Sequence, residues 1–366
     1  MINTIDDIKK FISDKNFKKI FLLCGEKSFV TSGAENLIKN LINEKKVKVF
    51  YKKSALPVLE ELKKIIIDVK KFKPDLILAI GGGAIIDYAK MSNVVDVRDD
   101  LADLIINYSY PFKEKFTKLA VIPTTAGSGA EVTSNAVIYV NGIKHSFESD
   151  LLIPDFFFLI PNFLISAPKK IKASAGFDAI AQALESLVSK KSNVNSVEYA
   201  TKSLKISLNS YVSFLQNPNL KNATEMSIAS NLAGKAINIS KTTAPHAVSY
   251  PFTSLFNISH GHAVSLFFEN FFEFNYNNID KSETSFDLKK RFDLIFDVIG
   301  VKNIQEFNSK ISKLKDQAKL DDNLLKLKID IDKSSTSIIN GINLLRLGNN
   351  PIKIDAKDIY DIISKI

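Results

Sequence analysis

Three of the four histidines in this 366-residue chain lie within seventeen positions, at His246, His260 and His262. They belong to the stretch SKTTAPHAVSYPFTSLFNISHGHAV, residues 240–264. Neutral imidazole is a common ligand for divalent transition metals. A single histidine more often has a structural role, but this clustering in a histidine-poor chain favours a shared metal site.

A carboxylate for such a site occurs in the segment GFDAIAQALES, where Asp178 and Gln182 are four residues apart. On a helix these two side chains share one face, although such a pair is often ordinary polar surface. Pro245 after two threonines is typical of a helix start, which places His246 in a first turn. His260 begins the next apolar segment. We therefore expect a divalent-metal site with one carboxylate, two imidazoles and an open position for a substrate oxygen.

Two loops of small residues follow apolar runs that are typical of strands. In DLILAIGGGAIIDYAK, residues 75–90, three glycines precede a helix whose first amides favour a phosphate, although a turn without a ligand explains the glycines equally well. The spacing differs from GxGxxG. In VIPTTAGSGAEVTSNAV, residues 121–137, hydroxyl side chains suit a nucleotide, and a surface turn is the alternative. Together the loops favour a nucleotide crevice at the ends of two strands.

The elements that position these residues change character along the chain. Short apolar runs at 18–25, 47–52, 75–83 and 118–125 alternate with helical patterns at 5–16, 31–44 and 57–72. This alternation predicts a doubly wound, mostly parallel α/β sheet. After about residue 165 the apolar spacing is almost entirely helical. We expect an α/β domain over 1–163 that binds a dinucleotide, and an all-α domain over 164–366 that binds metal and substrate.

Composition excludes several classes of protein. The 45% hydrophobic content suits a globular chain, and the longest apolar region, 151–168, is interrupted by Pro154, Asp155 and Pro161, which argues against a membrane span. The N-terminus lacks the layout of a signal peptide, and Cys24 is the single cysteine, so we expect a cytoplasmic protein without an internal disulfide. The net charge of +9 comes from dispersed lysines rather than a basic stripe, which favours small anionic ligands over nucleic acid.

The motifs GGGAIIDYAK, PTTAGSGAEVTSNAV, LLIPD, GFDAIAQALES and HAVSYPFTSLFNISHGHAV resemble, in order and spacing, those of the iron-containing (group III) alcohol dehydrogenases. The resemblance covers roughly residues 15–350. It implies an N-terminal dinucleotide-binding domain, a C-terminal helical domain, a divalent metal, NAD(P)-linked oxidoreduction and a tendency to form homodimers. A dehydroquinate synthase-like carbon–oxygen lyase and a non-catalytic relative are the alternatives.

The resemblance assigns cofactor contacts to ten positions. These are Gly82, Gly83, Ala84 and Asp87 on the pyrophosphate and nicotinamide side, Thr124, Thr125, Ser128 and Thr133 in the adenosine and phosphate region, Lys144, and Glu26. An acidic residue at position 26 would bind the ribose 2′-hydroxyl and repel a 2′-phosphate, so NAD(H) is favoured over NADP(H).

The resemblance assigns the metal to Asp178, His246 and His260, with two departures from the family pattern. Gln182 stands where the family usually has a histidine, and its amide oxygen is a weak ligand, so zinc competes with iron as the expected metal. Tyr250 stands where many members have a histidine on a proton path, and His262 is an alternative proton donor.

The wording from residue 238 to 264 is most similar to the phosphonoacetaldehyde reductases of this family. That similarity implies reduction of phosphonoacetaldehyde to 2-hydroxyethylphosphonate, with another small phosphorylated or acidic aldehyde as the alternative substrate. Lys241, five residues before His246, is expected to bind the anionic end of the substrate, unless it pairs with a carboxylate or with solvent.

Overall fold

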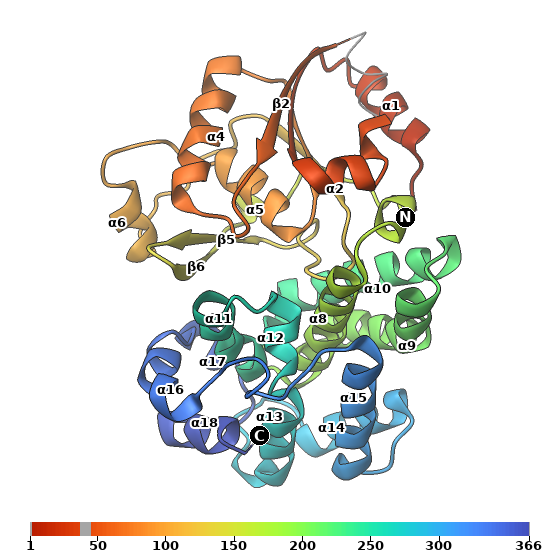
Figure 1. The fold of residues 1–366 in the computed structure, drawn as a ribbon, viewed down its shortest axis with the longest axis vertical. Helices are drawn as coiled ribbons and strands as arrows, with labels where there is room; N and C mark the ends of the chain where they lie inside the picture. The colour runs from red at the N-terminus through yellow and green to blue at the C-terminus, as the bar shows by residue number, and fades with distance from the viewer. Residues whose placement is uncertain (1, 37–44, 366) are drawn as a thin grey trace. The chain divides into compact units, whose positions relative to one another are not determined.

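The computed structural model describes residues 2–36 and 45–365, which form two compact units (Figure 1). Unit 1 comprises residues 1–168 and 219–228, and unit 2 comprises residues 169–218 and 229–366. The contacts thus divide the chain at Pro168, close to the expected boundary at 163. They also group the start of one long helix with unit 1, which chain order alone does not indicate.

Unit 1 contains a five-stranded parallel sheet in the order β2-β1-β3-β4-β7 and an antiparallel hairpin, β5-β6. Its elements are α1 (Ile5–Asp14), β1 (Lys19–Gly25), α2 (Glu26–Thr31), β2 (Lys46–Lys52), α4 (Leu59–Phe72), β3 (Leu76–Gly81), α5 (Gly83–Ser92), α6 (Leu101–Ile106), β4 (Lys118–Pro123), β5 (Asn135–Val140), β6 (Ile143–Glu148), β7 (Phe156–Phe157) and α7 (Asn162–Ile165). Part of the helix expected over 31–44 lies outside the described residues.

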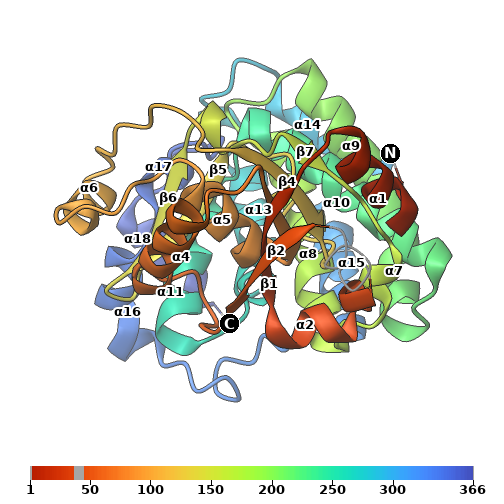
Figure 2. The same ribbon diagram turned by 90° about the horizontal axis from the view of Figure 1, so that it is seen from above.

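The central strands of the parallel sheet are buried on both faces, whereas the edge strand β2 is mostly half-buried. Every residue of β3 is buried, as are the five central residues of β1. On one face, alternate residues of β1, β3 and β4 form a core with α4 and α5, which lie beside the strands in Figure 2. A parallel sheet needs cover on both faces, so its strands appear in the sequence as continuous apolar runs. The sequence therefore predicted these strands and the α/β class correctly.

Unit 2 is built from helices. They are α8 (Lys169–Val188), α9 (Val194–Gln216), α10 (Leu220–Ser240, shared with unit 1), α11 (Ala244–Phe256), α12 (His260–Ser265), α13 (Phe268–Asn277), α14 (Leu288–Ile299), α15 (Ile304–Ala318), α16 (Ile331–Asn340), α17 (Leu344–Leu347) and α18 (Ala356–Ile363). One apolar core joins α11, α12, α13, α16 and α18. The apolar run that begins at residue 262 is divided between α12 and α13 rather than forming one helix.

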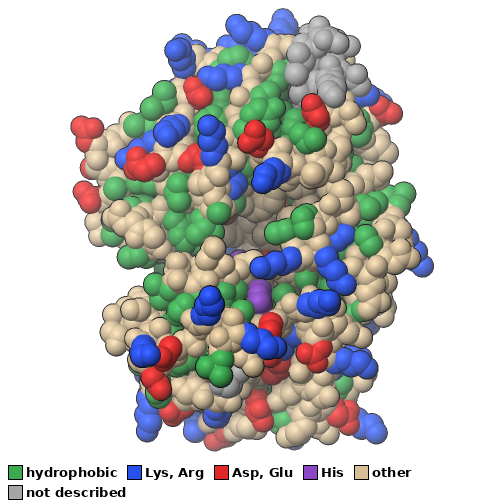
Figure 3. Space-filling view, viewed as in Figure 1, with side chains coloured by type: hydrophobic (Ala, Val, Ile, Leu, Met, Phe, Trp, Pro, Cys, Tyr) green, Lys and Arg blue, Asp and Glu red, His purple; other side chains and the backbone are tan. Residues whose placement is uncertain are grey.

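Lysine is the main charged residue on the surface. On the face shown in Figure 3, lysine and arginine side chains are dispersed over each unit among acidic and uncharged ones. Over residues 2–36 and 45–365, no helix combines the length and the apolar character that crossing a bilayer requires.

Candidate active site

The expected cofactor residues of unit 1 follow the carboxyl ends of adjacent parallel strands. Glu26 is the exposed first residue of α2, directly after β1. Gly82 and Gly83 follow β3, and Thr124 follows β4. Because β2 and β3 flank β1, the strand order reverses between β1 and β3. Dinucleotides bind outside the carboxyl ends of strands at such a reversal.

The two loops of small residues contact each other. A Cβ atom on Gly82 would lie 3.3 Å from Thr125 Oγ1, and one on Gly83 would lie 2.9 Å from Ser128 Oγ. The Thr124 amide donates to Gly81 O at 3.0 Å. Gly82 caps α5 without a side chain, so the first amides of α5, around Ala84, lie at an open positive helix end. The structure thus brings Gly82, Gly83, Thr125 and Ser128 together as a cradle with little side-chain bulk.

A buried lysine in the last turn of α5 contacts Thr133. Lys90 Nζ donates to Thr133 O at 2.8 Å and to Thr133 Oγ1 at 3.1 Å. Thr133, one of the expected cofactor residues, therefore also has a structural partner. Asp87 is half-buried one turn earlier on α5. Burial raises the pKa of its carboxyl, while the Lys90 charge, a Val137 backbone hydrogen bond and the Lys144 charge act in the opposite direction. Asp87 and Lys144 are therefore close enough to interact.

Unit 2 brings Asp178, His246 and His260 together from three helices. Their ligand atoms all lie within 4.8 Å of one another. Asp178 comes from the middle of α8, His246 from the first turn of α11, and His260 is the first residue of α12. His246 and Asp178 are buried, and the ring centroids of His246 and His260 are 5.3 Å apart. One carboxylate and two imidazoles at this spacing suit a divalent transition metal.

Gln182 lies one helical turn after Asp178 on α8 and is buried. Its Oε1 has no hydrogen-bond partner among the described residues. A buried amide oxygen without a partner is unfavourable, so an acceptor of this kind one turn from Asp178 fits a bound cation at the Asp178, His246 and His260 cluster. The donor set therefore suits the metal that the sequence implies.

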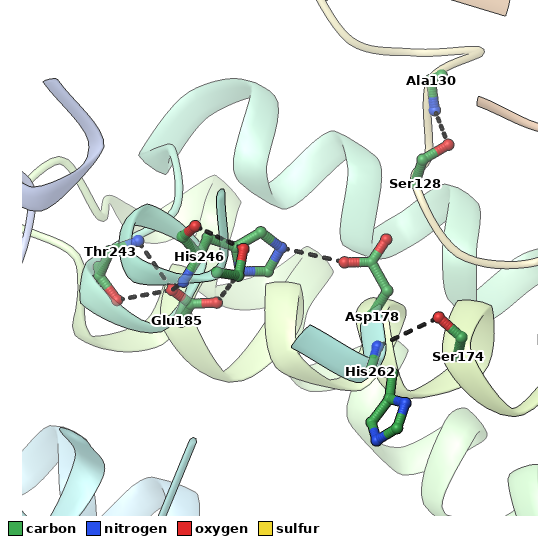
Figure 4. A network of polar contacts seen from close by, with 9 residues as sticks. Ser128, Ala130, Ser174, Asp178, Glu185, Thr243, His246 and His262 are labelled. Atoms are coloured by element: carbon green, nitrogen blue, oxygen red, sulfur yellow. Dashed lines mark hydrogen bonds and ion pairs between the residues drawn. The ribbon is translucent and has the colours of Figure 1, made fainter. Parts of the chain in front are cut away.

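His246 is held at both ring nitrogens (Figure 4). Its Nε2 lies 3.0 Å from Asp178 Oδ1, and its Nδ1 contacts Glu185 Oε2. Burial by itself would lower the pKa of this imidazole. The two carboxylates outweigh burial, Glu185 most strongly, and raise the pKa to about 10. Glu185 is fully buried on α8.

The three residues expected to act in catalysis are placed differently. Tyr250 is buried on α11, with its ring centroid 6.2 Å from that of His260. His262 points away from His246 in Figure 4, and its Nε2 lies 2.7 Å from Asp321 O. Lys241 has a left-handed backbone, φ 62°, and its Nζ donates to Asn238 O at 2.8 Å. The structure thus places Tyr250 beside the cluster of Asp178, His246 and His260 and does not place His262 there.

Glu185 is the residue that the sequence argument missed. The segment GFDAIAQALES, from which Asp178 and Gln182 were taken, also contains it, seven residues after Asp178. Positions i, i+4 and i+7 share one helix face. Asp178 and Gln182 were expected to face a metal. The signal that could have identified Glu185 was that it is a third polar residue on the same helix face.

Comparisons with known proteins agree with this architecture. The family model described as "Iron-containing alcohol dehydrogenase" matches residues 2–161, and the model "Fe-containing alcohol dehydrogenase family, C-terminal" matches residues 172–366. The 4-hydroxybutyrate dehydrogenase of Clostridium kluyveri is 30% identical over 286 residues, which cover 75% of this chain and 76% of that protein.

Two further similarities extend the comparison. The 1-propanol dehydrogenase of Citrobacter freundii is 28% identical over 74% of this chain and 69% of its own length. The crystal structure of sulfoacetaldehyde reductase from Bifidobacterium kashiwanohense in complex with NAD+ has a TM-score of 0.88 at 24% identity, covering 100% of this chain and 95% of that one. The chain therefore belongs to the iron-containing alcohol dehydrogenase family and is an oxidoreductase of the alcohol dehydrogenase type.

Proposed function

We propose that the protein interconverts a small aldehyde carrying an anionic group and the corresponding primary alcohol, using NAD(H) and one divalent metal. The observation that carries the proposal is the convergence of Asp178, His246 and His260, with their ligand atoms within 4.8 Å. Phosphonoacetaldehyde, with 2-hydroxyethylphosphonate as the product, is the substrate that we favour. The alternative is another small phosphorylated or acidic aldehyde.

Asp178, His246 and His260 would hold the metal, with the Gln182 amide oxygen as a weak fourth ligand. When bound, the metal polarises the substrate carbonyl and the nicotinamide carries the hydride. The chain supplies position: the amides at the start of α5 receive the pyrophosphate, and the cradle of glycines leaves room for it. The Tyr250 hydroxyl, beside His260, is the group that we assign to donate a proton to the substrate oxygen.

Two observations support an anionic substrate. Lys241 precedes His246 by five residues, and Arg346 lies near enough to affect it. Burial and the Arg346 charge lower the pKa of Lys241 to about 8, which still leaves the amine mostly protonated at neutral pH. Two similar proteins are named for substrates with a carboxylate or a sulfonate, 4-hydroxybutyrate and sulfoacetaldehyde.

Either iron or zinc fits the proposed ligand set, because a carboxylate, two imidazoles and an amide oxygen suit both. For the dinucleotide, the exposed carboxylate of Glu26 after β1 supports NAD(H) over NADP(H), since it would repel a 2′-phosphate.

A substrate panel tests the proposal. Oxidation of NADH and of NADPH is followed by absorbance with phosphonoacetaldehyde, a phosphorylated C3 aldehyde, succinic semialdehyde and butyraldehyde. We expect NADH to be preferred and the anionic aldehydes to have higher kcat/KM than butyraldehyde. The control, His260→Ala, should bind NADH normally but lose metal and about 1,000-fold in kcat/KM, equivalent to about 4 kcal/mol. Full activity of His260→Ala after chelation would overturn the metal site, whereas preference for butyraldehyde would overturn only the anionic substrate.

A further inference from the structure

We propose that Glu185 is a positioning residue that prepares His246 to bind the metal. Its carboxylate holds the imidazole hydrogen on Nδ1 and thereby leaves Nε2, the nitrogen that faces Asp178, as the ligand atom. This inference rests on the metal site of the proposed function and adds a residue outside the three-ligand cluster of Asp178, His246 and His260.

The contacts of Glu185 fix the direction of each hydrogen bond. Oε1 accepts from Thr243 N and Thr243 Oγ1, both at 2.9 Å, and from the His246 amide at 3.2 Å. The remaining oxygen, Oε2, contacts His246 Nδ1. An ionised carboxylate has no proton to donate, so Nδ1 must be the donor. By the same rule, the doubly protonated ring donates its Nε2 hydrogen to Asp178 Oδ1. When that hydrogen is lost, the neutral ring keeps its hydrogen on Nδ1, against Glu185, and has its lone pair on Nε2.

The geometry of α8 explains why one carboxylate reaches the far side of the ring. Asp178, Gln182 and Glu185 are separated by four and three residues, so they lie along one helix face. His246 spans this face, because its two ring nitrogens contact the first and last of the three residues. The imidazole of His246 thus bridges Asp178 and Glu185. Along α8, Gln182 lies between these two carboxylate residues.

The surroundings of Glu185 leave it little freedom to adopt another arrangement. The side chain is fully buried. It accepts hydrogen bonds from two backbone amides, one at the N-cap and one in the first turn of α11. The same carboxylate therefore fixes the start of α11 and the orientation of the imidazole on that turn. Carboxylates that accept from the second nitrogen of a metal-ligating histidine set its tautomer and raise its basicity, and their loss weakens metal binding.

The substitution Glu185→Gln separates this role from simple anchoring of α11. The glutamine oxygen can still accept from Thr243 and the His246 amide, but its NH₂ group then faces Nδ1 as a donor. The imidazole hydrogen would move to Nε2 and block the ligand position. We expect Glu185→Gln to bind Zn²⁺ about 10- to 100-fold more weakly than the wild type while keeping its folded circular dichroism spectrum.

The measurement is a titration of chelator-stripped, full-length protein with Zn²⁺ in competition with a chromophoric chelator. Glu61→Gln is the matched control, because Glu61 is also buried and also accepts two backbone amides, those of Lys53 and Ser54, but lies in unit 1. Thr243→Ala removes one donor to Oε1 and leaves the Nδ1 contact. Both variants should bind Zn²⁺ like the wild type. Equal affinity in Glu185→Gln and the wild type would overturn the inference and leave Glu185 as an anchor for α11.

A second measurement needs no variant and covers the case in which Glu185→Gln does not fold. The chain has four histidines, so selective ¹⁵N-histidine labelling gives a simple spectrum. In the Zn²⁺-loaded wild type, His246 should carry its hydrogen on Nδ1, and a hydrogen on Nε2 would overturn the inference. A wild-type protein that binds no Zn²⁺ or Fe²⁺ would instead defeat the metal site of the proposed function, so the two failures are distinguishable.

Discussion

At the scale of single residues, Gln182 is the side chain that most affects which metal the site would hold. It lies on the same face of α8 as Asp178 and Glu185, and its buried Oε1 has no hydrogen-bond partner among the described residues. A neutral amide oxygen is a weaker ligand for iron or zinc than an imidazole. Its presence here makes the proposed site less strongly binding than one with a third histidine.

Substitutions of Gln182 should therefore change metal affinity in either direction. We expect Gln182→His to tighten Zn²⁺ binding by about tenfold or more, because imidazole nitrogen is the better donor. Gln182→Leu, which removes the amide oxygen at similar size, should weaken binding by a few-fold. Competition titration measures both variants. If both bind Zn²⁺ with the wild-type affinity, position 182 does not contact the metal.

Residue types alone were enough to predict that Asp178, His246 and His260 lie together, because rare histidines near one another, with a carboxylate in another helical segment, imply a shared role. They were not enough for Glu185, since a glutamate in a helical segment is usually exposed. The contact of Glu185 with His246 Nδ1 depends on where the start of α11 lies in space relative to α8. No sequence pattern predicts that position.

At the scale of elements, the close approach of α12 to α8 positions His260. Gly261 is the second residue of α12, and a Cβ atom there would overlap Ser174 O of α8 and lie 2.9 Å from Asp178 Cβ. The Ser174 hydroxyl also accepts from the His262 amide at 3.2 Å. Backbone contact at this point needs glycine, and it brings His260 into reach of Asp178.

The substitution Gly261→Ala should force α12 away from α8 and disturb the metal cluster. We expect a loss of about 1–3 kcal/mol in the free energy of unfolding, typical of overpacking, together with less than half an equivalent of bound metal. Thermal unfolding and metal analysis measure the two effects. The control is Gly348→Ala, where the nearest atom to a new Cβ is 3.4 Å away and little change is expected. A Gly261→Ala variant that keeps wild-type stability and metal content would contradict this account of α12.

The elements that the sequence predicted best are those that are buried on all sides. The central strands β1, β3 and β4 of the parallel sheet are buried on both faces, so their apolar runs are continuous and easily recognised. The β5-β6 hairpin was missed because its burial alternates irregularly and its first strand follows a loop of small residues. The break between α12 and α13 was missed because the apolar spacing continues across residues 266–267.

At the scale of the whole molecule, the net charge of +9 should act on a charged substrate before it binds. The summed charge of a protein raises the encounter rate of ligands with the opposite sign, and salt screens this effect over about 10 Å at 0.1 M. Lys241, which we propose to bind the anionic end of the substrate, and the neighbouring Arg346 would add to the attraction. An anionic aldehyde should therefore react more slowly as salt is added, whereas a neutral aldehyde should not.

We expect kcat/KM for phosphonoacetaldehyde to fall by about three- to tenfold between 0.02 M and 0.5 M NaCl, measured with saturating NADH so that cofactor binding does not limit the rate. Butyraldehyde under the same conditions is the matched control, and its kcat/KM should change by less than twofold.

A Lys241→Met, Arg346→Met double variant removes the charges of these two residues, the local pair, but leaves most of the net charge. If the local pair dominates, the salt dependence for phosphonoacetaldehyde should largely disappear in this variant. Equal salt dependence for the two aldehydes in the wild type would show that charge does not guide the substrate.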